Sequence, residues 1–195
     1  MADIDQQKHE IRTRVRAQRK QRSEAERAST SAGFTEQLIA LCEGRRPKTV
    51  SCYVSVAGEP DTSGFLAWAA EQGIDVLLPV TRADGLMDWV LPSGDGFVPG
   101  PYGIPEPLGQ VVSPMAVGEV GLMIVPACSI DSSGVRLGWG GGYFDKTLGS
   151  MDKRPPVFAV VFADEFVDAL PADVHDIPVT GVVTPEQITY LDLSE

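Results

Sequence analysis

The stretch RLGWGGGYFDK, residues 136–146, combines residue types that suit a phosphate-binding loop. Four of the five positions from Gly138 to Gly142 are glycine, which lets the backbone bend tightly and approach another molecule closely. The run lies between an apolar segment and a predicted helix, where free backbone N–H groups and the helix dipole favour an anion. Arg136 and Lys146 flank it and could contact phosphate oxygens. The spacing matches neither GxxxxGK[ST] nor GxGxxG, so the pattern alone also allows a tight turn that packs a strand on a helix.

Asp145 lies at the far end of this run, where its charge would repel a bound phosphate. Two like charges about 4 Å apart repel by about 4 kcal/mol at an effective dielectric constant of about 20. A divalent cation reverses the sign, since Mg²⁺ commonly binds one or two carboxylates together with phosphate oxygens and water. The sequence therefore favours Asp145 as a magnesium ligand. The alternative is a solvated Asp in the first turn of a helix.

The sequence offers no nucleophile of a familiar kind. Its two histidines are His9 and His175, and the pairing of His175 with Asp176 in a proline-bracketed loop is more typical of a structural role. The three cysteines are Cys42, Cys52 and Cys128. They are far apart and form no CxxC or Cys/His cluster, which indicates reduced, buried thiols rather than a zinc site or a nucleophile.

The elements that must position these residues alternate between helices and strands. Helical periodicity and capping residues predict helices at 4–23, 31–43, 61–73 and 143–150. Apolar runs predict strands at 49–56, 74–80, 86–92, 120–131, 156–163 and 180–185, with 120–131 buried on both faces. Residues 92–109 contain ten Pro or Gly in eighteen, which predicts a functional loop without regular structure, or a linker. The alternation indicates an α/β layered fold with a largely parallel sheet.

The bulk composition fits one domain spanning residues 1–195, with 43% hydrophobic and 22% charged residues. No apolar run approaches the length of a membrane span, and the charged start does not resemble a secretory signal, so we expect a cytoplasmic protein with no membrane partner. Eight of the sixteen Lys and Arg residues lie between Lys8 and Arg27, and the net charge is −11. The acidic body argues against nucleic-acid binding. We expect a monomer.

Five motifs follow one another along nearly the whole chain. They are KHEIR, YVSVAGEPDT, YGIPEP, VPACSIDSSGVRLGWGGGYFDKTL (125–148) and LPADVHDIPVTGVVTPE. In this order they resemble the signature of the 5-formyltetrahydrofolate cyclo-ligases, also called 5,10-methenyltetrahydrofolate synthetases. The resemblance implies a three-layer α/β/α fold of the NagB/RpiA/CoA-transferase type, with ATP as co-substrate, Mg²⁺ as cofactor and a reduced folate as substrate.

The resemblance also implies the site residues. ATP would be bound by the basic helix and the glycine-rich segment, through Lys8, Arg12, Arg136, Leu137, Gly138, Trp139, Gly140, Gly141, Gly142, Tyr143 and Phe144. The folate would be bound by Val54, Glu59, Trp139, Gly140, Gly141, Gly142 and Tyr143, with the PYGIPEP loop closing over it. Asp145 and Asp176 would bind Mg²⁺, and the catalytic residues would be Arg136, Tyr143 and Asp145.

The chain departs from the family pattern at a few positions. Phe144 replaces the second Tyr of the usual pair, Ile130 stands where Phe usually precedes the Asp, and Gly141 occupies a position that is Lys in many members. The usual Ile after Glu59 is missing. These differences leave open an ATP-dependent enzyme that acts on another N-formyl or pterin-like compound. A second alternative is a noncatalytic module that senses a phosphate ligand, because related α/β sheets bind sugar phosphates in regulators.

Overall fold

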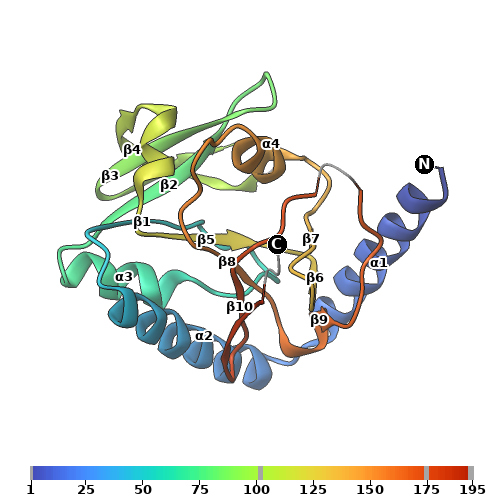
Figure 1. The fold of residues 1–195 in the computed structure, drawn as a ribbon. Helices are drawn as coiled ribbons and strands as arrows, with labels where there is room; N and C mark the ends of the chain where they lie inside the picture. The colour runs from blue at the N-terminus through green and yellow to red at the C-terminus, as the bar shows by residue number, and fades with distance from the viewer. Residues whose placement is uncertain (1, 101–102, 174–175, 193–195) are drawn as a thin grey trace.

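A computed structural model of the chain describes residues 2–100, 103–173 and 176–192 (Figure 1). Its centre is an eight-stranded sheet in the order β11-β10-β8-β5-β1-β2-β3-β4. These strands are β1 (Thr49–Ser51), β2 (Asp75–Thr81), β3 (Met87–Pro99), β4 (Pro105–Val112), β5 (Leu122–Pro126), β8 (Val157–Val160), β10 (Gly181–Val183) and β11 (Ile188–Tyr190). The five strands from β10 to β2 pair in parallel, whereas β11 at one edge and β3 and β4 at the other pair antiparallel.

A second, three-stranded sheet has the order β7-β6-β9. Its strands are β6 (Ser129–Asp131), β7 (Arg136–Leu137) and β9 (Phe166–Val167). The helices are α1 (Ala2–Gln21), α2 (Glu24–Arg45), α3 (Ser63–Glu71), α4 (Tyr143–Gly149) and the 3₁₀ helices η2 (Pro114–Glu119) and η3 (Ala163–Glu165).

The helices form layers on both faces of the large sheet. Figure 1 shows α2 and α3 on one side of the sheet and α4 on the other. Successive residues of β5 alternate between the two cores: Ile124 packs in the core under α2 and α3, while Met123 and Val125 pack in the core that includes Leu148 of α4. Burial on both faces explains why the parallel strands read as continuous apolar runs. The predicted α/β class with a largely parallel sheet is confirmed.

Helix α1 runs beside the small sheet rather than over the large one (Figure 1). It buries few residues, chiefly Val15, which packs with Leu137 and Cys128. Helix α2 begins earlier than the predicted residue 31, because Ser23 caps it and exchanges hydrogen bonds with Glu26. The helices at 61–73 and 143–150 and the strands at 74–80, 156–163 and 180–185 are confirmed with shifted ends.

The prediction that 92–109 has no regular structure is wrong. This segment belongs largely to a long antiparallel hairpin, in which β3 extends through Pro99 and β4 begins at Pro105. Prolines are tolerated there because β4 is an edge strand and the pairing shifts register between Pro92 and Phe97. Gly109 lies opposite Pro92, and a Cβ at that glycine would meet the Leu91 carbonyl oxygen at 2.1 Å.

Two predicted strands are also too long. The strand expected at 49–56 ends at Ser51, and the chain then turns so that the Tyr53 carbonyl accepts a hydrogen bond from Thr62 Oγ1 at 2.7 Å. The single strand expected at 120–131 is two strands, because the chain leaves the large sheet after Pro126 and joins the small one at Ser129. None of the helices in the described ranges has the length and apolar character required to cross a membrane.

Candidate active site

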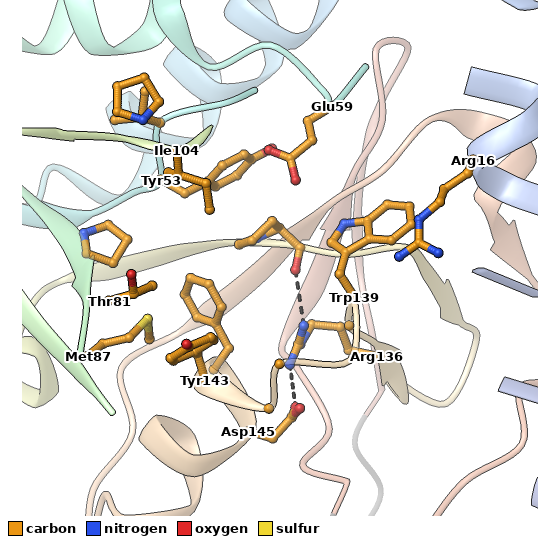
Figure 2. Close-up of a pocket in the computed structure, with 18 residues that line it drawn as sticks. Arg16, Tyr53, Glu59, Thr81, Met87, Ile104, Arg136, Trp139, Tyr143 and Asp145 are labelled. Atoms are coloured by element: carbon orange, nitrogen blue, oxygen red, sulfur yellow. Dashed lines mark hydrogen bonds and ion pairs between the residues drawn. The ribbon is translucent and has the colours of Figure 1, made fainter. Parts of the chain in front are cut away.

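A cavity of about 600 Å³ opens between the glycine-rich segment, the chain that follows β1, and strands β2 and β3 (Figure 2). Most of the predicted site residues line it: Val54, Glu59, Arg136, Gly138, Trp139, Gly141, Gly142, Tyr143, Phe144 and Asp145. The remaining predicted residues lie outside its lining: Lys8, Arg12, Leu137, Gly140 and Asp176. The structure therefore gathers most of the nucleotide and folate residues of the resemblance around one space.

The glycine-rich segment forms the loop between β7 and α4. Gly140 and Gly142 have φ of 102° and 68°, a left-handed conformation that favours glycine. A Cβ at Gly138 would lie 3.0 Å from Nη1 of Arg136, so the loop passes close to this guanidinium. The glycines thus let the backbone curl around Arg136 and deliver the chain into α4.

Arg136 and Asp145 form an ion pair at one end of this cavity (Figure 2). The Arg136 side chain is 3% exposed, and its Nη1 donates to the Pro126 carbonyl oxygen at 3.1 Å while Nη2 donates to Asp145. Asp145 is 36% exposed.

The turn before Arg136 is held by buried Asp131, whose Oδ1 accepts from the N–H groups of Ser133 and Val135. This supporting role of Asp131 was not predicted.

Lys8 and Asp176 form a second ion pair, with Nζ 2.9 Å from Oδ2 and both side chains largely buried. His175, which precedes Asp176, lies outside the described residues. Each of the two carboxylates expected to bind Mg²⁺ is therefore paired with a cation expected to bind phosphate. Among residues 2–100, 103–173 and 176–192, no group of three or more His, Cys, Asp or Glu side chains is suited to hold a metal ion.

Helix α1 holds the glycine loop from outside. Arg12 Nε donates to the Gly138 carbonyl oxygen at 2.8 Å, and the guanidiniums of Arg16 and Arg19 lie over the Trp139 ring at 5.2 and 4.9 Å from its centre. Arg16 also lines the cavity and was not among the predicted site residues. The sequence held a signal for Arg16: it lies four residues after Arg12, and residues four apart share one face of a helix.

Glu59 lies at the other end of the cavity from Asp145 (Figure 2). It sits in a tight turn, in which its N–H donates to the Val56 carbonyl oxygen at 2.9 Å and its Oε2 accepts from the Val56 N–H at 3.1 Å. Burial raises the pKa of Glu59, while this hydrogen bond and the positive charge of Arg19 act in the opposite direction. A half-buried carboxylate with a free oxygen can accept hydrogen bonds from a ligand with several N–H groups.

The remaining wall is mostly apolar and comes from the hairpin side of the sheet. It includes Pro79, Met87, Ile104 and Pro105, none of which was predicted except through the PYGIPEP motif. Pro101 and Tyr102 of that motif lie outside the described residues. An apolar wall facing a few polar groups is the usual form of a small-molecule site.

The three cysteines are buried and free, as predicted. Burial raises the pKa of Cys52 to about 12 and that of Cys42 and Cys128 to about 11. None of them lines the cavity, so a thiolate nucleophile has no support from the described residues.

Comparison with known proteins identifies close similarity across the chain. Residues 4–185 match the 5-formyltetrahydrofolate cyclo-ligase family. A 5-formyltetrahydrofolate cyclo-ligase from Mycolicibacterium smegmatis is 34% identical over 185 residues, which cover 92% of this chain and 94% of the relative. The NMR structure of Aquifex aeolicus 5,10-methenyltetrahydrofolate synthetase has a TM-score of 0.80 and 29% identity, covering 94% of this chain and 92% of that one. A 5,10-methenyltetrahydrofolate synthetase from Mycoplasma pneumoniae supports the fold, with a TM-score of 0.75 at 18% identity, covering 92% and 99%.

Proposed function

Because this chain belongs to the 5-formyltetrahydrofolate cyclo-ligase family, a family of enzymes, we propose that it converts 5-formyltetrahydrofolate and ATP into 5,10-methenyltetrahydrofolate, ADP and phosphate. One observation carries the proposal for this chain. The same cavity is lined by the glycine loop, by Arg136 and Asp145, and by Glu59, the carboxylate that the family resemblance assigns to folate binding. A cavity of about 600 Å³ lies within the range of small-molecule sites, so both reacting groups can meet in it.

The glycine loop end would hold the triphosphate. Arg136, which lines the cavity, and Lys8, which lies outside its lining, are the candidates for the phosphate charges, and each is already held by a carboxylate. When phosphate oxygens arrive, these cations can exchange a carboxylate partner for a phosphate partner. Arg12 would act differently, because its Nε donates to the Gly138 carbonyl oxygen and so fixes the shape of the loop.

The proposed binding of Mg²⁺ depends on the same exchange of partners. The carboxylates of Asp145 and Asp176 are hard oxygen donors of the kind that Mg²⁺ prefers, and two carboxylates with phosphate oxygens and water complete its usual coordination. When bound, the ion would neutralise charge on the transferring phosphoryl group. Release of the cation partners from Asp145 and Asp176 would leave both carboxylates free for it.

The Glu59 end would hold the folate. An ionised carboxylate at this position can accept hydrogen bonds from the N–H groups of the pterin ring, and Val54 lies on the same wall. Tyr143 and the loop backbone would lie between the pterin and the triphosphate. The formyl oxygen and the terminal phosphate would then face one another.

The reaction needs alignment more than a protein nucleophile. The formyl oxygen attacks the γ-phosphorus, and the bond to the bridging oxygen breaks with its electron pair leaving on ADP. N10 of the folate then attacks the activated formyl carbon and loses its proton, and the carbon–oxygen bond breaks to release phosphate. Positioning and charge stabilisation dominate such transfers, which agrees with a site built from backbone, cations and carboxylates.

The proposal is tested by mixing the protein with ATP, Mg²⁺ and 5-formyltetrahydrofolate and following the methenyl product by absorbance and phosphate release in parallel. We expect both signals to depend on all three components. Phosphate release that ignores 5-formyltetrahydrofolate but responds to another N-formyl compound in a substrate panel would assign a different substrate to the same site. Tight ATP binding with no release on any substrate would instead indicate a sensing module.

A further inference from the structure

A buried ion pair lies next to Trp139, which lines the cavity, and has no part in the proposed function so far. Arg19 of α1 and Glu165 of η3 have side chains 5% and 1% exposed, and two hydrogen bonds of 2.7 and 2.8 Å join the guanidinium to the carboxylate. Arg19 Nη2 also donates to the Ala127 carbonyl oxygen at 2.9 Å. Burying two charges is costly even when they are paired, and such pairs often add no stability over apolar residues. The pair therefore suggests a role beyond holding the fold.

Arg19 connects the two walls that the proposed function uses. Its guanidinium lies over the Trp139 ring, 4.9 Å from the centre, so it supports the glycine loop. It also lines a second cavity of about 320 Å³, which Glu59 lines as well. Glu165 does not line this second cavity, so of the two paired side chains only the positive one shares a cavity with Glu59. Arg19 Nη1 has no hydrogen-bond partner among the described residues.

We propose that Arg19 is a positioning residue for the folate site, which supplies the positive charge that keeps Glu59 ionised and the surface on which Trp139 rests. This rests on the proposed function only in that Glu59 is taken to bind the pterin. A carboxylate that loses water to burial tends to take up a proton, and a protonated Glu59 would accept fewer hydrogen bonds from a pterin. A nearby fixed cation opposes that protonation.

The other charged groups near Glu59 are less suited to this role than Arg19. Those on the two cavities that share Glu59 are Arg16, Arg22, Arg27, Tyr53, Asp61, Arg136 and Asp145. Arg22 pairs with the exposed Asp164, and Arg136 pairs with Asp145 at the other end of the first cavity (Figure 2). Arg19 is paired as well, but its partner Glu165 does not line the second cavity that Arg19 and Glu59 share. The hydrogen bond from the Val56 N–H and, after it, the positive charge of Arg19 oppose the effect of burial on the pKa of Glu59. Helix α1 would thus tune the chemistry of a turn far along the chain.

The test removes the pair without leaving a buried charge alone. Arg19→Met by itself would strand Glu165 in the interior, so the informative variant is the double substitution Arg19→Met with Glu165→Met, which keeps apolar volume. Arg19→Lys retains a positive charge and serves as the conservative rescue. Arg22→Met is the matched control, since Arg22 directly follows the same helix and lines the same second cavity.

The direct readout is the titration of Glu59 by NMR with ¹³C-labelled glutamate, the signal being assigned by its loss in Glu59→Gln. We expect the Glu59 pKa to rise by about half a unit to one unit in the double variant, because the loss of the Glu165 charge offsets only part of the loss of Arg19, which shares a cavity with Glu59. It should stay near the wild-type value in Arg19→Lys and Arg22→Met. At a pH between the Glu59 pKa of the wild type and that of the double variant, the KM for 5-formyltetrahydrofolate should rise several-fold in the double variant while that for ATP changes less. An unchanged Glu59 titration in the folded double variant would overturn the role of Arg19. The titration requires no turnover, so a wild-type protein that forms no methenyl product would refute the proposed function separately.

Discussion

Asp145→Asn separates the proposed magnesium role of Asp145 from its contribution to the fold. In the free protein the carboxylate is the partner of Arg136, but it is 36% exposed, so water screens the pair. Losing it should cost about 1 kcal/mol of folding free energy, and the melting temperature should fall by about 2–4 °C for a chain of this size. The effect on catalysis should be larger. One unit charge about 4 Å from another is worth about 4 kcal/mol at an effective dielectric constant of about 20, which corresponds to roughly 10³-fold.

We therefore expect turnover of Asp145→Asn to fall by at least about 100-fold at a Mg²⁺ concentration that saturates the wild type. The assay follows methenyl formation over a Mg²⁺ titration, with circular dichroism to verify the fold. Asp164→Asn is the matched control, because Asp164 also pairs with an arginine, Arg22, but does not line the cavity. Turnover of Asp145→Asn within about fivefold of that control would refute the magnesium assignment.

Three further predictions concern the two ends of the cavity and the helix packing. Arg136→Met should raise the KM for ATP far more than that for the folate, and Glu59→Gln should do the reverse; equal effects on both substrates would contradict the assignment. Burial raises the pKa of Glu59 above its usual 4.5. The kcat/KM for the folate should therefore fall as the pH drops toward the raised pKa and Glu59 takes up a proton. A flat pH profile would exclude Glu59 as the group that binds the pterin. In α2, Gly44→Ala should stabilise the protein by about 0.5–1 kcal/mol, because nothing lies near the new methyl group. Gly33→Ala should destabilise it, because its Cβ would meet the Pro185 carbonyl oxygen at 2.4 Å. Urea unfolding measures the free energy of unfolding of both variants.

The contiguous part of the site was predictable from the sequence because its residues are neighbours along the chain. The loop from Arg136 to Asp145 carries its own conformational signal in its glycines. Arg16 and the apolar wall around Met87 were not predicted, because their place in the cavity depends on how distant elements pack. Helical spacing puts Arg16 on the face of α1 that carries Arg12, but it cannot say which residue of that face reaches the cavity.

The hairpin of β3 and β4 shows a different limit. Proline and glycine content is a local signal, and it led to an irregular loop at 92–109. The actual structure depends on pairing between distant residues, such as Pro92 with Gly109, and on the edge position of β4. A strand at an edge can lack hydrogen-bond donors on one side, so composition alone could not reveal it.

The contacts of α1 have a consequence for the order in which the protein is made. Its arginines and Lys8 reach partners 126, 146 and 168 positions further along, at Gly138, Glu165 and Asp176. On the ribosome the basic helix is made before these partners, and at about 5–20 residues per second it waits many seconds for them. Throughout that interval the carboxylates that pair with the helix have not been made. The end of the cavity that we propose to bind nucleotide is therefore completed only when the last sixth of the chain has been synthesised.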